Sequence, residues 1–142
     1  MQSVIRNIVL LAVVAIATAC NTPPRTVEVV DHEGSVCSSA EEIVYDNQDS
    51  LCSRDIKIVV RYDRTYKADS IALRVLTVAP DSMVLEEPFV LRVPRLSDLR
   101  PDEQTFLYRS NVTLRHKGEY LFRLTPEKAV EGIASVGLII EE

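Results

Sequence analysis

The sequence predicts an all-β protein, folded as a single antiparallel β-sandwich of six to eight strands. Apolar and polar side chains alternate with period two through most of the chain after Thr26, which places one set in a core and the other in water. Turn residues separate these runs. Only residues 125–130 suggest a helical turn, with Thr125 as its cap and Pro126 at its first position. Short strands with almost no helix favour two packed sheets.

Length and composition fit one domain. The chain has 142 residues, of which 46% are apolar and 26% charged, and it shows no internal repeat. We expect the sandwich domain over residues 26–142. The formal net charge of −5 provides no basic field for nucleic acid, so nucleic acid is excluded from the expected partners.

The first twenty residues have the pattern of an export signal. One cation, Arg6, precedes an unbroken apolar run over 8–17, and small residues lead to Cys20. The run is too short to span a bilayer. A cysteine at the cleavage point resembles a bacterial lipoprotein signal, in which Cys20 is diacylated, with palmitate-like chains, and becomes the first residue. We expect a signal peptide over 1–19 and a lipidated cysteine with its tether over 20–25. A plain secretory peptide or a buried helix is the alternative.

A lipid anchor predicts where the protein resides. Acyl chains on Cys20 would hold the domain at a membrane surface without crossing the membrane. The residues after Cys20 include no acidic run of the kind that resembles the surface-export signal of Bacteroidetes lipoproteins. We therefore expect a cell-envelope protein, lipid-anchored at the periplasmic face of the outer or inner membrane. Its oligomeric state stays open.

The expected strands fall into two kinds. Amphipathic strands, in which apolar and polar residues alternate, are predicted within 56–62, 106–115 and 120–124. Two runs, 71–78 and 133–140, are apolar on both faces, as central strands are.

Two connections are predicted as well. Residues 116–119 are few enough to join two strands as a hairpin. The polar stretch 31–53 is predicted to be a long irregular loop.

Cysteine count adds a disulfide hypothesis. If Cys20 carries lipid, Cys37 and Cys52 remain as an even pair in an oxidising compartment. Their bond would close a loop of about 16 residues and stabilise the fold by about 3 kcal/mol. Two separate thiols are the alternative.

No catalytic or metal-binding constellation stands out. His32 and His116 are far apart, and residues 46–49 lack the glycine and closing glutamate of a calcium loop. No Gly-x-Ser-x-Gly elbow is present. We expect no enzymatic activity, no cofactor and no metal. A hydrolase would need His116, a carboxylate and a nucleophile in one cleft.

Aromatic residues keep a glycan-binding function open. Tyr45, Tyr62 and Tyr66 lie near predicted loops, where exposed rings could stack on sugars. Tyr62 also fits the core alternation, and the chain has no Trp. A glycan-binding lipoprotein of a nutrient-uptake system is therefore the alternative function.

A short Asp-Ser-apolar motif occurs three times, at Ser50, Ser70 and Ser82. It resembles the acceptor of general O-glycosylation in exported Bacteroidetes proteins, so these serines are candidate modification sites. A short motif has a high rate of chance matches, and Asp-Ser also begins turns.

The C-terminal third resembles the gliding-motility lipoprotein GldH family of Bacteroidetes. Residues 108–112, 118–122 and 131–141 carry the resemblance, the last block with a Gly-Ile, a Val-Gly and an apolar strand that ends on glutamate. The chain would be a divergent, shorter member that lacks the family's tryptophans. Gly132 and Gly137 match family positions, and we interpret them as a turn and a close backbone contact or bulge.

The resemblance implies a lipoprotein of the gliding-motility and type IX secretion context, without catalytic residues. We therefore predict a non-enzymatic protein that acts through protein–protein interaction with other envelope proteins, as an interaction or structural component. An exposed apolar patch would favour this function.

Overall fold

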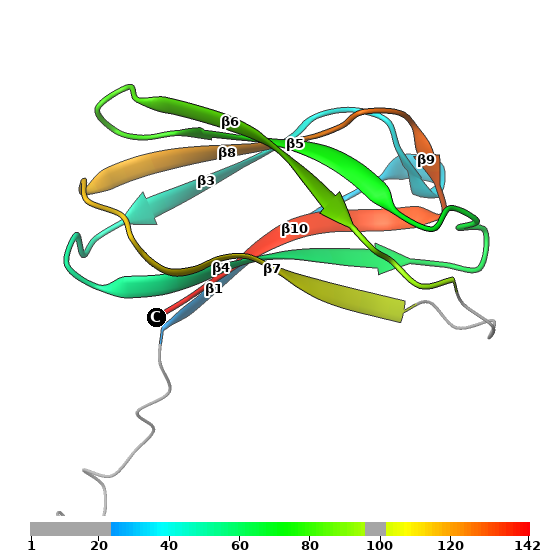
Figure 1. The fold of residues 1–142 in the computed structure, drawn as a ribbon, viewed down its shortest axis with the longest axis horizontal. Helices are drawn as coiled ribbons and strands as arrows, with labels where there is room; N and C mark the ends of the chain where they lie inside the picture. The colour runs from blue at the N-terminus through cyan, green and yellow to red at the C-terminus, as the bar shows by residue number, and fades with distance from the viewer. Residues whose placement is uncertain (1–23, 96–101) are drawn as a thin grey trace, which may run out of the picture.

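The computed structural model describes residues 24–95 and 102–142, and in them two antiparallel sheets pack face to face (Figure 1). The predicted signal peptide 1–19 and Cys20 lie outside the described residues. The first sheet has the order β1 (Arg25–Asp31), β10 (Ile133–Glu141), β4 (Ser53–Tyr62) and β7 (Asp102–Thr113). The second has the order β3 (Glu41–Asn47), β8 (Gly118–Pro126), β5 (Ile71–Val78) and β6 (Val84–Leu91). The predicted β-sandwich is confirmed.

A smaller set of elements closes one end of the sandwich. The 3-10 turn η1 (Glu33–Ser35) leads into β2 (Val36–Cys37), which pairs with β9 (Val130–Glu131). This small sheet lies beside the start of β10, where the His32 amide donates to the carbonyl of Ala134 over 2.8 Å.

The core follows the predicted alternation. Ile56, Ile58 and Val60 of β4 are at most 2% exposed, and they pack with Leu138 of β10 and Leu124 of β8. The two runs predicted to be central, now β5 and β10, each lie between two neighbouring strands. β10 is buried on both faces, whereas β5 is buried on one face and exposes Arg74 on the other.

Three local predictions are wrong. Residues 125–130 form no helical turn: Thr125 pairs with Arg74 in β8, and β9 begins at Val130. The predicted hairpin at 116–119 is a crossover, because β7 and β8 belong to different sheets. The predicted loop 31–53 contains β3, whose Ile43 is buried, while Glu42 and Asp46 face outward from this edge strand.

Two glycines are required by close backbone approach. Gly132 has φ of +85°, and a Cβ there would lie 2.1 Å from the amide nitrogen of Tyr66. At Gly137, a Cβ would lie 2.2 Å from the Glu28 carbonyl oxygen of the paired strand β1. The predicted turn and the predicted close contact are both confirmed.

The two ends of the sandwich differ in what they gather. One end, which we name the Pro24 end, holds Pro24, Glu142, loop 48–52, turn 79–83 and crossover 114–117. Direct contacts join these segments: the Glu142 amide donates to the Pro24 carbonyl over 3.1 Å, and the Asn47 side chain donates to the carbonyls of Leu114 and His116. The other, which we name the far end, holds η1, β2, β9 and turn 63–70 (Figure 1).

Candidate interaction surface

Exposed large apolar side chains in the described part of the chain are confined to edge strands and to two loops. None lies on the four central strands β10, β4, β8 and β5. Two are the tips of loops at the Pro24 end, Leu51 at 90% and Met83 at 69% exposure. The others are Val27 of β1, Val44 of β3, Val84, Leu85 and Val90 of β6, and Leu107 of β7.

An apolar groove of about 490 Å³ opens at the Pro24 end between the two sheets. The β5–β6 turn and the start of β6 form one wall, with Met83, Val84 and Leu85. The β7–β8 crossover and β8 form the other wall, with Leu114 and Tyr120. Because β6 is an edge strand, no further strand of the described chain covers this wall.

One contact between polar side chains connects the two walls of the groove. His116 Nε2 lies 3.2 Å from Asp81 Oδ2, and both side chains are partly exposed. The other Asp81 oxygen accepts from the Met83 amide over 3.1 Å, which shapes the turn. The Tyr120 hydroxyl accepts from the His116 amide over 3.2 Å. The pair therefore helps to set the width of the groove.

The His116–Asp81 pair supplies two of the three groups that a hydrolase would need. In residues 24–95 and 102–142, no hydroxyl or thiol is hydrogen-bonded to the His116 imidazole. A nucleophile activated by this histidine would require such a bond. The same described residues contain no group of three or more His, Cys, Asp or Glu that could hold a metal ion.

Beyond the groove, a polar cluster ties the edges of the two sheets together. The Tyr108 hydroxyl and the Arg109 guanidinium both donate to Glu87 of β6, and Phe89 packs edge-on against the Tyr108 ring with centroids 5.3 Å apart. Burial, and then the bond to Glu87, raise the pKa of Tyr108 to about 12. These contacts hold β6 in place beside β7.

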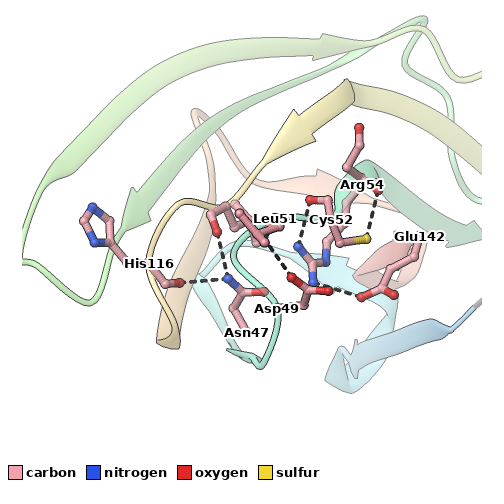
Figure 2. A network of polar contacts seen from close by, with 9 residues as sticks. Asn47, Asp49, Leu51, Cys52, Arg54, His116 and Glu142 are labelled. Carbon is pink, nitrogen blue, oxygen red and sulfur yellow. Dashed lines mark hydrogen bonds and ion pairs between the residues drawn. The ribbon is translucent and has the colours of Figure 1, made fainter.

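A second cluster of polar side chains organises the Pro24 end (Figure 2). Arg54, 2% exposed, donates to Glu142 over 2.9 Å and to the Cys52 carbonyl over 3.3 Å, and its guanidinium carbon lies 5.9 Å from the Tyr45 ring centroid. Asn47, fully buried, donates to the carbonyls of Leu114 and His116 over 2.9 and 2.8 Å. Both side chains hold loops that border the end of the sandwich.

Sequence reasoning missed Arg54 and Asn47, although a signal was present. Asn47 continues the inward phase of Ile43, and Arg54 continues the inward phase of Ile56 and Ile58. A polar residue in an apolar phase marks a buried group that must find hydrogen-bond partners.

The predicted disulfide between Cys37 and Cys52 is not formed, because the two residues lie at opposite ends of the sandwich. Cys37 pairs with Val130 at the far end, and Cys52 precedes β4 at the Pro24 end. The ten residues of β4 separate the two ends by about 30 Å at about 3.3 Å per residue. A disulfide needs Cα atoms within about 7 Å. Burial raises the pKa of the Cys37 thiol to about 11.

The three Asp-Ser-apolar motifs do not have the same structure. Asp49 Oδ1 accepts from the Leu51 amide over 2.8 Å, and Asp81 Oδ1 accepts from the Met83 amide, so Ser50 and Ser82 lie in Asp-capped turns. Ser70 instead precedes Ile71, which is 1% exposed. O-glycosylation at Ser50, Ser70 and Ser82 stays a prediction.

The tyrosines that were candidates for stacking on sugars are not exposed. Tyr62 and Tyr66 are at most 1% exposed and pack edge to face with centroids 5.6 Å apart, and Tyr45 is half-buried beside Arg54. The described residues include all eight aromatic side chains of the chain, and each of them is buried or half-buried.

The described part also contains no helix of sufficient length and apolarity to cross a membrane.

Comparisons with known proteins yield distant structural likenesses only. No protein-family model matches the chain, and no curated protein matches its sequence. The fold is similar to part of latent PorU from Porphyromonas gingivalis (TM-score 0.35, 8% identity), with 88% of this chain aligned to 13% of that one. It is similar to the Yersinia pseudotuberculosis-derived mitogen (TM-score 0.36, 9% identity, 84% and 86% covered). A carbohydrate-binding module of the β-sandwich superfamily aligns with TM-score 0.37 and 10% identity, over 80% of this chain and 51% of that one. Likenesses at this level carry no functional argument.

Proposed function

We propose that this protein is a non-enzymatic, lipid-anchored β-sandwich that binds another protein of the cell envelope. The apolar groove at the Pro24 end is the observation that carries the proposal. Met83, Val84 and Leu85 are each more than half exposed on its wall, although the same chain buries comparable side chains throughout its central strands. A partner that covers the groove would remove this apolar surface from water.

The resemblance of residues 131–141 to the GldH family supports the class of partner. It points to machinery of the gliding-motility or type IX secretion kind, and it brings no catalytic residues with it. The glycan-binding alternative needs exposed rings. The Tyr62 and Tyr66 rings are in the core, so no observation favours that alternative.

In-cell crosslinking tests the proposal. The tagged, lipidated protein is crosslinked and purified, with the Cys20→Ala form as the control that cannot be lipidated. Recovery of gliding or type IX secretion components, lost in the control, is the expected result. Recovery of glycan-uptake proteins in their place would contradict it.

A further inference from the structure

We propose that the Pro24 end of the sandwich rests on the lipid surface, with Leu51 and Met83 inserted into the bilayer interface. The inference rests on the proposed lipid anchor at Cys20. It adds a second point of attachment, made by the folded domain itself, and it sets the orientation of the domain on the membrane.

The length of the tether places this end close to the bilayer. Five residue steps from Cys20 to Arg25 span at most about 18 Å. The sandwich extends about 30 Å away from that point, along the ten residues of β4. The Pro24 end is therefore the part of the domain that the anchor brings to the lipid, and the far end is directed away from it.

A chain of contacts links the loop that carries Leu51 to the point where the tether joins the domain. The Pro24 carbonyl accepts from the Glu142 amide. The Glu142 side chain pairs with Arg54, and Arg54 donates to the carbonyl of Cys52, the neighbour of Leu51 (Figure 2). At 90%, Leu51 is the most exposed large apolar side chain of the described residues.

Met83 is presented in the same way by the turn between β5 and β6. Both tips are the third residue of an Asp-Ser-apolar motif, and in both the aspartate accepts from the amide of the tip residue. The bond from Leu51 lowers the pKa of Asp49, so the carboxylate that shapes this turn stays charged. Two capped turns therefore hold apolar side chains outward at one end.

The third copy of the motif shows that the motif alone does not require exposure. It lies at the far end, where Asp69 pairs with Arg95 over 2.9 Å and Ile71 is 1% exposed at the start of β5. Exposed apolar tips thus occur at the end that the anchor brings to the membrane. Apolar side chains held at loop tips beside a lipid anchor match the chemistry of a bilayer interface.

This orientation also limits the partner. The groove shares Met83 with the inserted tips, so it opens at the level of the lipid headgroups. A protein that fills it would be embedded in the membrane or bound to its surface.

Depth-dependent fluorescence quenching tests the inference. The lipidated full-length protein, with Cys52→Ser, is labelled with one fluorophore at Leu51→Cys or Met83→Cys, and at Lys128→Cys as the matched control. Lys128 is exposed at the far end, and Cys37 is buried and stays unlabelled. The protein is reconstituted into phosphatidylethanolamine–phosphatidylglycerol vesicles with brominated acyl chains.

Loss of most of the fluorescence at positions 51 and 83, with little loss at 128 and no reversal at high salt, is the expected result. If the protein floats with the vesicles but quenching is equal at all three positions, or absent from all of them, the insertion of the Pro24 end is overturned and the lipid anchor is not. Quenching that high salt reverses would contradict apolar insertion. Protein that does not float with the vesicles would overturn the anchor, and this inference with it.

Discussion

The two ends of this sandwich differ in how tightly their residues pack and in how much apolar surface they expose. At the far end, η1 and the β2–β9 pair cover the core, Tyr62 and Tyr66 pack against each other, and Gly132 lies against the Tyr66 backbone. At the Pro24 end, a groove stays open, two apolar tips are exposed, and buried Arg54 and Asn47 hold the loops. The far end has a smaller groove of about 300 Å³ beside Thr65, Lys67 and Lys128, whereas the groove of the Pro24 end is larger, at about 490 Å³, and its lining includes the apolar tip Met83. We therefore expect substitutions in the packed far end to affect stability most, and substitutions in the groove of the Pro24 end to affect the proposed binding.

The largest expected effect comes from crowding the far end. Gly132→Ala would place a Cβ within 2.1 Å of the Tyr66 backbone at φ of +85°, so the free energy of unfolding should fall by about 4 kcal/mol. Urea denaturation measures this change. Gly34→Ala is the matched control, since φ there is +64° but nothing lies within 4 Å of the added Cβ, and a loss of about 1 kcal/mol is expected. Equal losses would show that the close packing at Gly132 contributes little.

Alkaline pH should weaken the same end through Cys37. Its folded pKa of about 11 lies above the unfolded value of 9.0 because burial disfavours the thiolate. Below pH 9 both states keep the proton; as pH rises toward 11 the unfolded chain loses it first. The free energy of unfolding should therefore fall by about 2 to 3 kcal/mol across this window. Urea unfolding at several pH values measures the change, and Cys37→Ala should remove this share of it. An unchanged profile in that variant would assign the loss to other groups.

At the Pro24 end, Arg54→Met tests whether the buried cation supports the loops. The change keeps most of the side-chain volume and leaves Glu142 without its partner at 2.9 Å. We expect a loss of about 2 kcal/mol, below the usual cost of breaking a buried pair, because the Glu142 side chain remains partly solvated. Arg61→Met, which breaks an exposed pair with Glu103, should leave the urea midpoint unchanged. If the urea midpoint of Arg54→Met were also unchanged, Arg54 would not support this end.

The smallest effect on stability should accompany the largest loss of binding. Leu85→Ser changes a groove residue that is 52% exposed, so its melting temperature should stay within a degree or so of the parent protein, since exposed positions contribute little to stability. Recovery of the crosslinked partner should fall severalfold, as measured by quantitative mass spectrometry. Val90→Ser, on the same strand at 55% exposure and outside the groove, should bind as the parent does. Loss of binding in both variants would mean that the groove is not the docking surface.

Side-chain patterns along the chain predict the layers better than they predict the connections between them. Residues 71–78 and 133–140 are more apolar on both faces than the other predicted strands, which is sufficient to predict two central strands. By contrast, the short segment 116–119 is compatible with both a hairpin and a crossover, because the length of a loop does not specify which sheet the next strand joins. An even number of cysteines likewise carries no information on the distance between them, which is about 30 Å for Cys37 and Cys52.

The candidate site could be predicted only in part. Arg54 and Asn47 interrupt an apolar phase and so could have been identified as buried polar groups. The groove could not be identified, because its walls come from turn 79–83 and crossover 114–117, which meet only when the two sheets pack. The exposure of Leu51 and Met83 likewise depends on the ends of strands whose register no local pattern defines.

Site-specific photocrosslinking in living cells tests the central claim most directly. A photoreactive amino acid is placed at Leu85 in the groove or at Val90 on the same strand outside it, in the lipidated protein. An adduct of one defined mass from position 85, absent from position 90 and containing a membrane-bound envelope protein, is the predicted result. Adducts from position 90 alone, or identical adducts from both positions, would contradict the account.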